Sequence, residues 1–121
     1  MAEERAILAL IEEVELFYLD SDSKTKKVLA RVDSGATASS IDKVLAEEVG
    51  FKETNRVKLV KSASGVGRRP LILVKTKIKN KMMEEEFTLA DRKHMKYPIL
   101  IGQNILKKGD FLIDPNKEVI L

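Results

Sequence analysis

One short turn in this sequence carries a residue whose type and setting could do chemistry. Asp33-Ser34-Gly35-Ala36 follows the apolar run 28–32 and precedes a patch of small polar residues at 37–40. The pattern predicts a strand that enters a tight turn, because glycine supplies the backbone freedom that such a turn needs. A carboxylate held by a hydrogen-bonded turn suits general acid–base catalysis. The same tetrapeptide also occurs in ordinary turns, where Asp and Ser only cap the backbone.

Length and composition limit what can surround this turn. The chain has 121 residues, 44% of them apolar, and predicts one packed domain over 1–121. It contains no cysteine, which excludes disulfides, a thiol nucleophile and a cysteine-based zinc site. The opening residues Met1–Arg5 do not resemble a signal peptide, and no apolar run is long enough to span a membrane. We therefore expect a cytoplasmic protein that does not interact with membranes.

Charge is distributed unevenly along the chain, although the net charge is only +3. Residues 1–20 are predominantly acidic, whereas the basic residues of 52–81 far outnumber the single acid, Glu53. Two interpretations stay open. Either the basic stretch is a solvated face that discourages strand aggregation, or it is a positive surface that attracts an anionic partner.

The remaining pattern predicts many short strands and few helices. Apolar and β-branched runs predict strands at 14–19, 26–33, 56–62, 69–79, 82–90, 98–101, 111–114 and 117–121. A helix is expected over about 41–49, with Ser40 as its N-cap and Gly50 at its end. One or two further helical turns are expected over 102–108. Short strands punctuated every eight to twelve residues favour a mainly β fold, a small closed β-barrel with one or two short helices.

Two glycines mark the tip of a hairpin between the strands at 56–62 and 69–79. The tip, Ala63-Ser64-Gly65-Val66-Gly67-Arg68, is predicted to be flexible. No Gly-Lys-Ser/Thr follows it and it leads into a strand, so it is not a phosphate-binding loop.

The order of these features resembles the retropepsin-like aspartic peptidases. That family carries Asp-Thr/Ser-Gly-Ala, then a flap hairpin, then an apolar-apolar-Gly-x-Asn-apolar-apolar segment, here Leu100-Ile101-Gly102-Gln103-Asn104-Ile105-Leu106. The stretches Arg68-Arg69-Pro70 and 86–102 are similar to a subfamily associated with the ribosomal glutamate ligase RimK, often labelled ATP-dependent zinc protease. Known activity there implies cleavage of poly-glutamate tails on a ribosomal protein. Members commonly have a basic residue and a histidine where Thr37 and Asp42 stand here.

The resemblance implies roles for particular residues. Asp33 would be the catalytic carboxylate, with Ser34 and Gly35 shaping its turn, and Ala36, Ile101 and Gly102 would form the scaffold behind it. Flap and basic-hairpin residues would contact substrate; they are Lys61, Ser64, Gly65, Val66, Gly67, Arg68 and Arg69.

Aspartic peptidases need two carboxylates that share a proton, yet this chain has one Asp-Ser-Gly. The second carboxylate is therefore expected from a second copy, in a C2 homodimer with Asp33 paired across the axis. Neither the zinc nor the ATP of the subfamily label is expected, because the chain has one histidine, His94, and no Walker sequence. His94 itself is expected to be a loop residue without a ligand role. We expect no cofactor and no metal.

Two functions from different classes remain open at this stage. The first is an aspartic endopeptidase of retropepsin type that acts on acidic or glutamate-rich chains, such as a glutamate-modified ribosomal protein. The second is a non-catalytic retropepsin-like module whose basic hairpin holds an anionic protein or RNA. The sequence has no nucleic-acid-binding motif and few aromatic residues for base stacking, which argues against nucleic acid as the partner.

Overall fold

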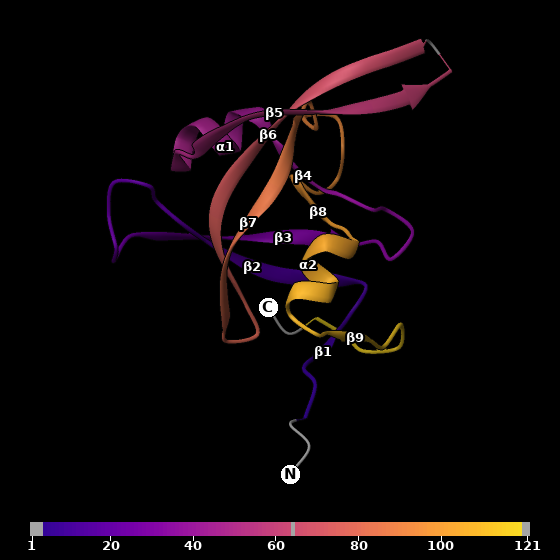
Figure 1. Cartoon of the computed structure of the whole chain (residues 1–121). Helices are drawn as coiled ribbons and strands as arrows, with labels where there is room; N and C mark the ends of the chain where they lie inside the picture. Colours follow the sequence, from indigo (N-terminus) through magenta and orange to yellow (C-terminus); the bar gives the residue numbers. More distant parts are fainter. Residues whose placement is uncertain (1–3, 64, 120–121) are drawn as a thin grey trace.

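The computed structural model describes residues 4–63 and 65–119, and they form a mainly β domain (Figure 1). The strands are β1 (Ile7–Leu8), β2 (Ile11–Phe17), β3 (Thr25–Val32), β4 (Ser39–Asp42), β5 (Lys52–Ser62), β6 (Gly65–Ile78), β7 (Lys81–Ala90), β8 (Ile99–Ile101) and β9 (Leu112–Ile113). The helices are α1 (Lys43–Val49) and α2 (Gln103–Lys108).

A closed barrel forms the body of the molecule. Its strands follow the order β2-β3-β8-β4-β7-β6, and β6 pairs back onto β2 at Glu15↔Lys77 and Leu16↔Thr76. Closure removes free sheet edges, and the inward side chains alternate with outward ones along each strand. Along β6, Ile72, Val74, Thr76 and Ile78 are buried. The expected fold, a mainly β closed barrel with one or two short helices, is confirmed.

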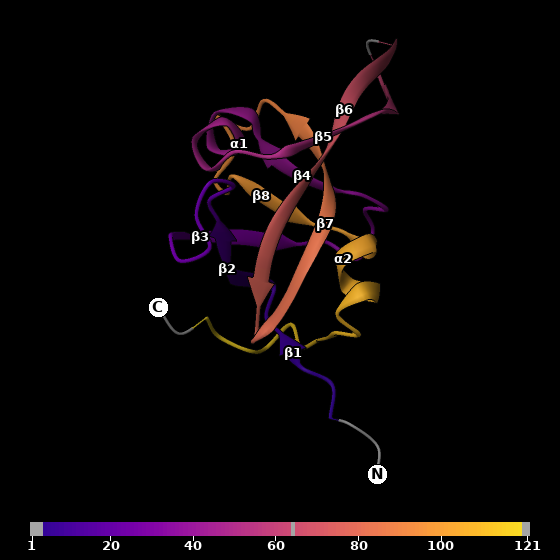
Figure 2. The ribbon, with the colours of Figure 1, turned by 60° about the vertical axis from the view of Figure 1, so that its left-hand side comes forward.

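Strand β5 lies outside the closed ring and pairs only with β6 among the described strands. The outer part of this hairpin extends away from the barrel, as the two views show (Figures 1 and 2). Its register runs from Arg56↔Leu71 to Ser62↔Gly65, after a bulge between Glu53 and Arg56. The predicted hairpin is present, and both of its strands are longer than expected.

The first helix begins later than the sequence predicts. Ser40 is not its N-cap, because Ser39–Asp42 forms β4 between β7 and β8, and Asp42 occupies the N-cap position. Strand pairing with distant segments outweighs the local capping preference of Ser40. Gly50 does end the helix, with a φ of 81° that glycine tolerates best, and its N–H donates to Ala46 O.

Below the barrel, β1 and β9 form a short parallel pair. The predicted final strand over 117–121 is not found in its described part, 117–119. Lys117 instead donates from Nζ to Ile7 O at 2.7 Å. A strand needs a partner for its backbone groups, and the β1–β9 pair ends at Ile113. Among the described residues, no helix has the length and apolarity needed to cross a membrane.

Candidate active site

The Asp33 turn is held in one conformation by its own backbone. Asp33 N donates to Ile101 O at 2.9 Å, and Ala36 N donates to Asp33 O at 3.2 Å. Gly35 N donates to Asp33 Oδ1 at 2.9 Å, which orients the carboxylate. A Cβ on Gly35 would lie 3.2 Å from the same Oδ1, so glycine gives this hydrogen bond its room. Asp33 remains partly exposed at the end of β3 and is therefore accessible to a substrate or a second copy.

The start of α2 supports the turn from behind. Gln103 donates from its backbone N to Ala36 O and from Nε2 to Ser34 O, both at 2.8 Å. Gly102 lies so close to the chain after the turn that a Cβ there would be 2.3 Å from Ala38 O. The predicted scaffold residues Ala36, Ile101 and Gly102 therefore do lie against the Asp33 turn. Gln103 adds a side-chain contact that the sequence did not assign.

A second layer of hydrogen bonds fixes α2 against the barrel. Ser39 Oγ accepts from Gly102 N at 2.9 Å and donates to Asn104 Oδ1 at 2.7 Å. Asn104 Nδ2 donates onward to Glu86 O at 2.9 Å. Ser39 is fully buried, so its hydroxyl needs both partners. The Asn of the Gly-x-Asn motif thus has a structural role, which the motif's position suggested but no local pattern specified.

The hairpin reaches the Asp33 turn through Lys58, whose Nζ donates to Thr37 Oγ1 at 3.3 Å. Residues opposite one another in an antiparallel pair share a face, and neighbours along a strand alternate. Arg69, which lies opposite Lys58, is therefore on the face toward the turn. Arg68 lies opposite Leu59 and belongs to the other face.

The remaining predicted flap residues divide in the same way. Lys61 and Val66 are paired with each other and share the face of Arg68, while Gly65 and Gly67 alternate with them. Lys61, Val66 and Arg68 are all exposed. Ser64 lies outside the described residues. Of the predicted basic contacts, the structure thus brings Arg69 to the side of Asp33 and points Lys61 and Arg68 the other way.

Asp42 and Arg92 form a polar centre at the end of β4. Arg92 donates from its backbone N to Asp42 Oδ1 at 2.8 Å and from Nε to Tyr97 O at 3.1 Å. Burial lowers the pKa of the Arg92 guanidinium, and the positive charges of Arg69 and Arg31 lower it further, while Asp42 opposes them. Three arginines from separate segments therefore lie within electrostatic range of one another.

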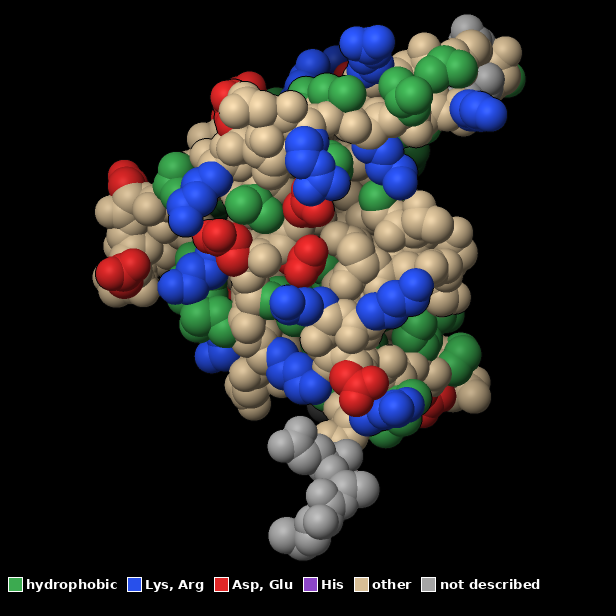
Figure 3. All heavy atoms as spheres, in the orientation of Figure 1, with side chains coloured by type: hydrophobic (Ala, Val, Ile, Leu, Met, Phe, Trp, Pro, Cys, Tyr) green, Lys and Arg blue, Asp and Glu red, His purple; other side chains and the backbone are tan. Residues whose placement is uncertain are grey.

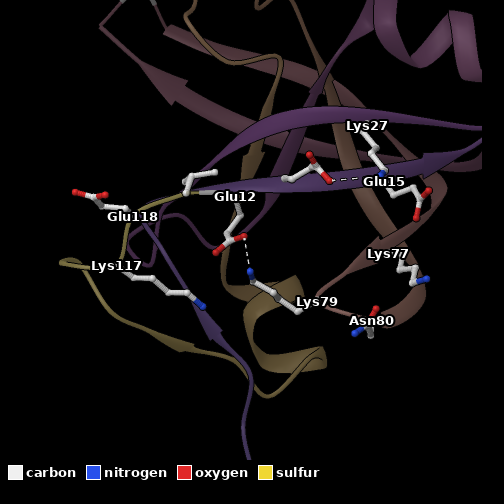
Figure 4. Close-up of a pocket in the computed structure, with 10 residues that line it drawn as sticks. Glu12, Glu15, Lys27, Lys77, Lys79, Asn80, Lys117 and Glu118 are labelled. Atoms are coloured by element: carbon white, nitrogen blue, oxygen red, sulfur yellow. Dashed lines mark ion pairs between the residues drawn. The ribbon is translucent and has the colours of Figure 1, made fainter. Parts of the chain in front are cut away.

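At the barrel end of β6, two lysines lie near glutamates of β2. Lys79 Nζ, in the turn after β6, lies 3.5 Å from Glu12 Oε2, and Lys77 is opposite Glu15 in the backbone ladder. Glu12 is 4% exposed and also accepts from Ala9 N at 2.7 Å. These groups line a cavity of about 400 Å³ whose wall contains both lysines and glutamates (Figure 4). The cavity includes no residue of the Asp33 turn, so we assign its charges to stability.

The other aspartates of the described chain have positions of their own. Asp42 accepts from Arg92 N, Asp110 pairs with Arg5, and Asp91 and Asp114 accept from nearby backbone N–H groups. Asp20 and Asp22 lie in the turn between β2 and β3. Among the described residues, no three His, Cys, Asp or Glu side chains cluster in a way that could hold a metal ion. His94 is exposed in the loop after β7.

Comparison with known proteins assigns the family. The model of the RimB-like family, retropepsin-like aspartic endopeptidase RimB, matches residues 45–121. The chain therefore belongs to the RimB-like family of retropepsin-like aspartic endopeptidases, as the sequence predicted. The matched range begins after the Asp33 turn. No curated protein matches the sequence closely enough to add a relative.

Solved structures share the fold. A Legionella pneumophila protein of unknown function has a TM-score of 0.65 at 20% identity, covering 96% of this chain and 98% of that one. The protease of simian foamy virus has a TM-score of 0.58 at 21% identity, over 80% of this chain and 91% of its own. EIAV protease in complex with an inhibitor has a TM-score of 0.59 at 15% identity, over 98% and 95%. These likenesses establish the retropepsin-like fold.

Proposed function

We propose that the protein is an aspartic endopeptidase that works as a C2 homodimer, with one Asp33 from each copy in a single active site. The observation that carries this proposal is the Asp33 turn itself. Its carboxylate is oriented by Gly35 N, supported from behind by Gln103, and left partly exposed at the end of a strand. Family membership and the retropepsin-like fold support the same reaction.

The dimer is needed because one chain supplies one such turn. Two carboxylates about 3 Å apart share a single proton, since both cannot ionise at that distance. The ionised Asp33 takes a proton from water, and the water oxygen attacks the peptide carbonyl carbon. The protonated Asp33 of the other copy donates its proton to the carbonyl oxygen. Collapse of the tetrahedral intermediate breaks the C–N bond, and the nitrogen leaves with a proton as the new amine.

The substrate we propose is an acidic or glutamate-rich chain, such as a glutamate-modified ribosomal protein. Support comes from the outer hairpin, where Lys58, Lys61, Arg68 and Arg69 have no acidic partner among the described residues. Of these, Lys58 and Arg69 lie on the face toward Asp33, where a positive surface would concentrate an anionic ligand. The hairpin would close over the substrate and exclude water. Association with RimK and a cytoplasmic location complete the proposal.

A second candidate is a non-catalytic module that uses the same basic hairpin to hold an anionic protein or RNA. The cations of the outer hairpin that have no described acidic partner are consistent with this binding module and equally with a peptidase whose hairpin binds an acidic substrate. The oriented carboxylate of Asp33 distinguishes the two functions, because binding an anion does not need an exposed acid at the centre of the site.

Cleavage of a poly-glutamate-tailed peptide by wild-type protein and by Asp33→Asn, from acidic to neutral pH, tests the proposal. Cleavage by wild type that disappears in Asp33→Asn is the expected result, because Asn cannot exchange the proton. Asp91→Asn, in an exposed loop, is the matched control and keeps wild-type activity. No cleavage by wild type, with tight peptide binding by both proteins, would replace the proposal with the binding module.

A further inference from the structure

One charged residue of the barrel lies beside the catalytic turn and has no assigned role. Arg31 interrupts the apolar end of β3, two residues before Asp33. Ala30 and Val32, on either side of it, are buried, while Arg31 is exposed. Since alternate residues of a strand share a face, Arg31 projects from the same face as Asp33. Two residues along a strand span about 6.7 Å, so the backbone positions of Arg31 and Asp33 are about that far apart.

The floor beside Arg31 is built from the neighbouring strands. Arg31 is paired with Leu100 of β8, Leu100 with Ser40 of β4, and Ser40 with Thr88 of β7. Paired residues share a face, so these four side chains form one row across the barrel wall. Ser40 Oγ and Thr88 Oγ1 satisfy each other at 2.8 Å. The row is therefore cationic at its β3 end, apolar at Leu100 and polar at its β4 and β7 end.

Two more arginines approach the same place from other segments. Arg69 comes from the hairpin face that reaches toward Thr37, and Arg92 comes from the loop after β7. Tyr97 O accepts the Nε–H of Arg92, which fixes its side chain and leaves the terminal nitrogens of the guanidinium for another acceptor. Burial is the main cause of the lowered pKa of Arg92, and the positive charges of Arg69 and Arg31 lower it further.

This cluster is costly unless an anion joins it. Among the described residues, no carboxylate forms an ion pair with Arg31, Arg69 or Arg92. Arg69 also lies directly opposite Lys58, and like charges in that position destabilise a β ladder. Asp42, which contacts Arg92, accepts its backbone N–H with Oδ1, and no ion pair between Asp42 and the Arg92 guanidinium is found among the described residues. Unpaired arginines around an open strand end are suited to bidentate recognition of a carboxylate.

We propose that Arg31, with Arg69 and Arg92, binds a side-chain carboxylate of the substrate within two residues of the bond that Asp33 cleaves. The proposal rests on the proposed peptidase function and names the group that would select an acidic chain. An extended substrate advances about 3.3 Å per residue, so a side chain one or two positions from the cut reaches the cluster. In a C2 dimer the second copy places the same cluster on the other side of the bond.

The test measures binding and cleavage separately. Fluorescence anisotropy compares a labelled penta-glutamate peptide with a penta-glutamine peptide of equal length, using Asp33→Asn so that neither is cut. Arg31→Met in this background is the test variant, and Arg31→Gln repeats it with a polar residue. Lys24→Met is the matched control, because Lys24 is an exposed cation just before β3, at the end far from Asp33, where its ammonium lies over the Tyr18 ring. Thermal melting verifies that each variant folds.

The expected result is a selective loss of acidic binding. Penta-glutamate affinity falls about tenfold in Arg31→Met, as expected for a lost charge-assisted hydrogen bond, while penta-glutamine affinity is unchanged. Lys24→Met changes either affinity less than about twofold. In the active enzyme, Arg31→Met raises KM for acidic peptides and leaves kcat near wild type.

Two results would overturn the assignment. If Arg31→Met and Lys24→Met weaken penta-glutamate binding by the same factor, general charge rather than a subsite attracts the peptide. If Arg31→Met and Arg31→Gln both retain the discrimination, Arg31 does not contact the carboxylate. A failure of the peptidase proposal gives a different result. Wild type then cleaves neither peptide, while the Asp33→Asn protein still binds penta-glutamate more tightly than penta-glutamine, and this preference still depends on Arg31.

Discussion

The two parts of the β5–β6 hairpin carry the same kind of charge in opposite settings. At the barrel end of β6, Lys77 lies opposite Glu15 of β2, and Lys79, in the turn after β6, forms an ion pair with Glu12. Where the hairpin leaves the barrel, Lys58 faces Arg69 and no described acid pairs with either. Figure 3 shows red and blue side chains mixed over the barrel, and blue beside green on the outer hairpin.

This difference separates charge that stabilises the fold from charge that is available for binding. The sequence alone left the basic stretch 52–81 open to a solvated face or a surface for an anionic partner, and only the outer part keeps cations without a described acidic partner, as the proposed binding surface requires. The outer part also exposes large apolar side chains, with Leu59 60% and Val66 63% exposed. Neighbouring cations that repel one another, together with exposed apolar side chains, lower the stability of a free protein. Such features are typical of binding surfaces.

The largest effect is expected from a matched pair of glycines. Gly102→Ala forces a Cβ to within 2.3 Å of Ala38 O, so we expect the free energy of unfolding to fall by about 3 kcal/mol or more. Gly67→Ala, on the outer hairpin, meets its nearest atom at 4.0 Å and should change stability by less than about 0.5 kcal/mol. Urea unfolding measures both. Equal losses would mean that the outer hairpin is packed as tightly as the active-site scaffold.

A smaller loss is expected where the barrel pairs its charges. Glu12→Ala leaves the buried N–H of Ala9 and the ammonium of Lys79 without their acceptor, which should lower the free energy of unfolding by about 2 kcal/mol. Glu13→Ala is the control, since its contact with Lys27 is exposed and 4.0 Å long, and it should cost at most about 0.5 kcal/mol. Glu12→Ala that unfolds like wild type would contradict a stabilising role for the barrel charges.

The outer hairpin should respond with the opposite sign. Arg69→Gln relieves repulsion with Lys58 and Arg92, so we expect the free energy of unfolding to rise by up to about 0.5 kcal/mol at low salt. Affinity for an acidic peptide should fall at the same time. Chemical denaturation at two salt concentrations, together with peptide anisotropy, measures the trade-off. A loss of stability greater than about 1 kcal/mol would show that Arg69 supports the fold.

The smallest effect concerns the exposed cluster between α1 and the β2–β3 hairpin. Hydrogen bonds from Lys26 and Tyr18 lower the pKa of Glu48. A carboxyl whose folded pKa is lowered adds stability above its unfolded pKa and loses it as the pH falls through the folded pKa. Glu48→Gln should therefore melt slightly below wild type at pH 7, and the two curves should converge below about pH 4. A gap that persists in acid would mean that the charge of Glu48 is not its source.

Local chemistry made the Asp33 turn and the alternation of β6 predictable. The turn depends on a few adjacent residues, and the buried positions of β6 follow the period of a strand. Arg31 also left a local signal, because it is a charged residue in an apolar strand two positions before Asp33. The sequence alone does not show what lies beside Arg31. The pairing of β3 with β8 does, because it places Arg31 next to Leu100, nearly 70 positions away.

Contacts between distant segments account for what the sequence did not predict. Ser40 resembles a helix cap in isolation, yet it lies in β4 because Thr88 and Leu100 offer it ladder partners. Arg92 meets Asp42 across 50 residues, and no periodic pattern records that contact. The division of the hairpin cations between two faces likewise follows from register, which a single sequence does not specify.

A mixed-subunit experiment tests most directly whether two copies of Asp33 form one active site. Wild-type protein is held at a fixed concentration, refolded with increasing amounts of Asp33→Asn, and assayed on a poly-glutamate-tailed peptide. Because a mixed dimer lacks one carboxylate of the pair, activity should fall to about half at equal amounts of the two proteins, as random pairing requires. Activity that stays constant however much Asp33→Asn is added would contradict the shared site.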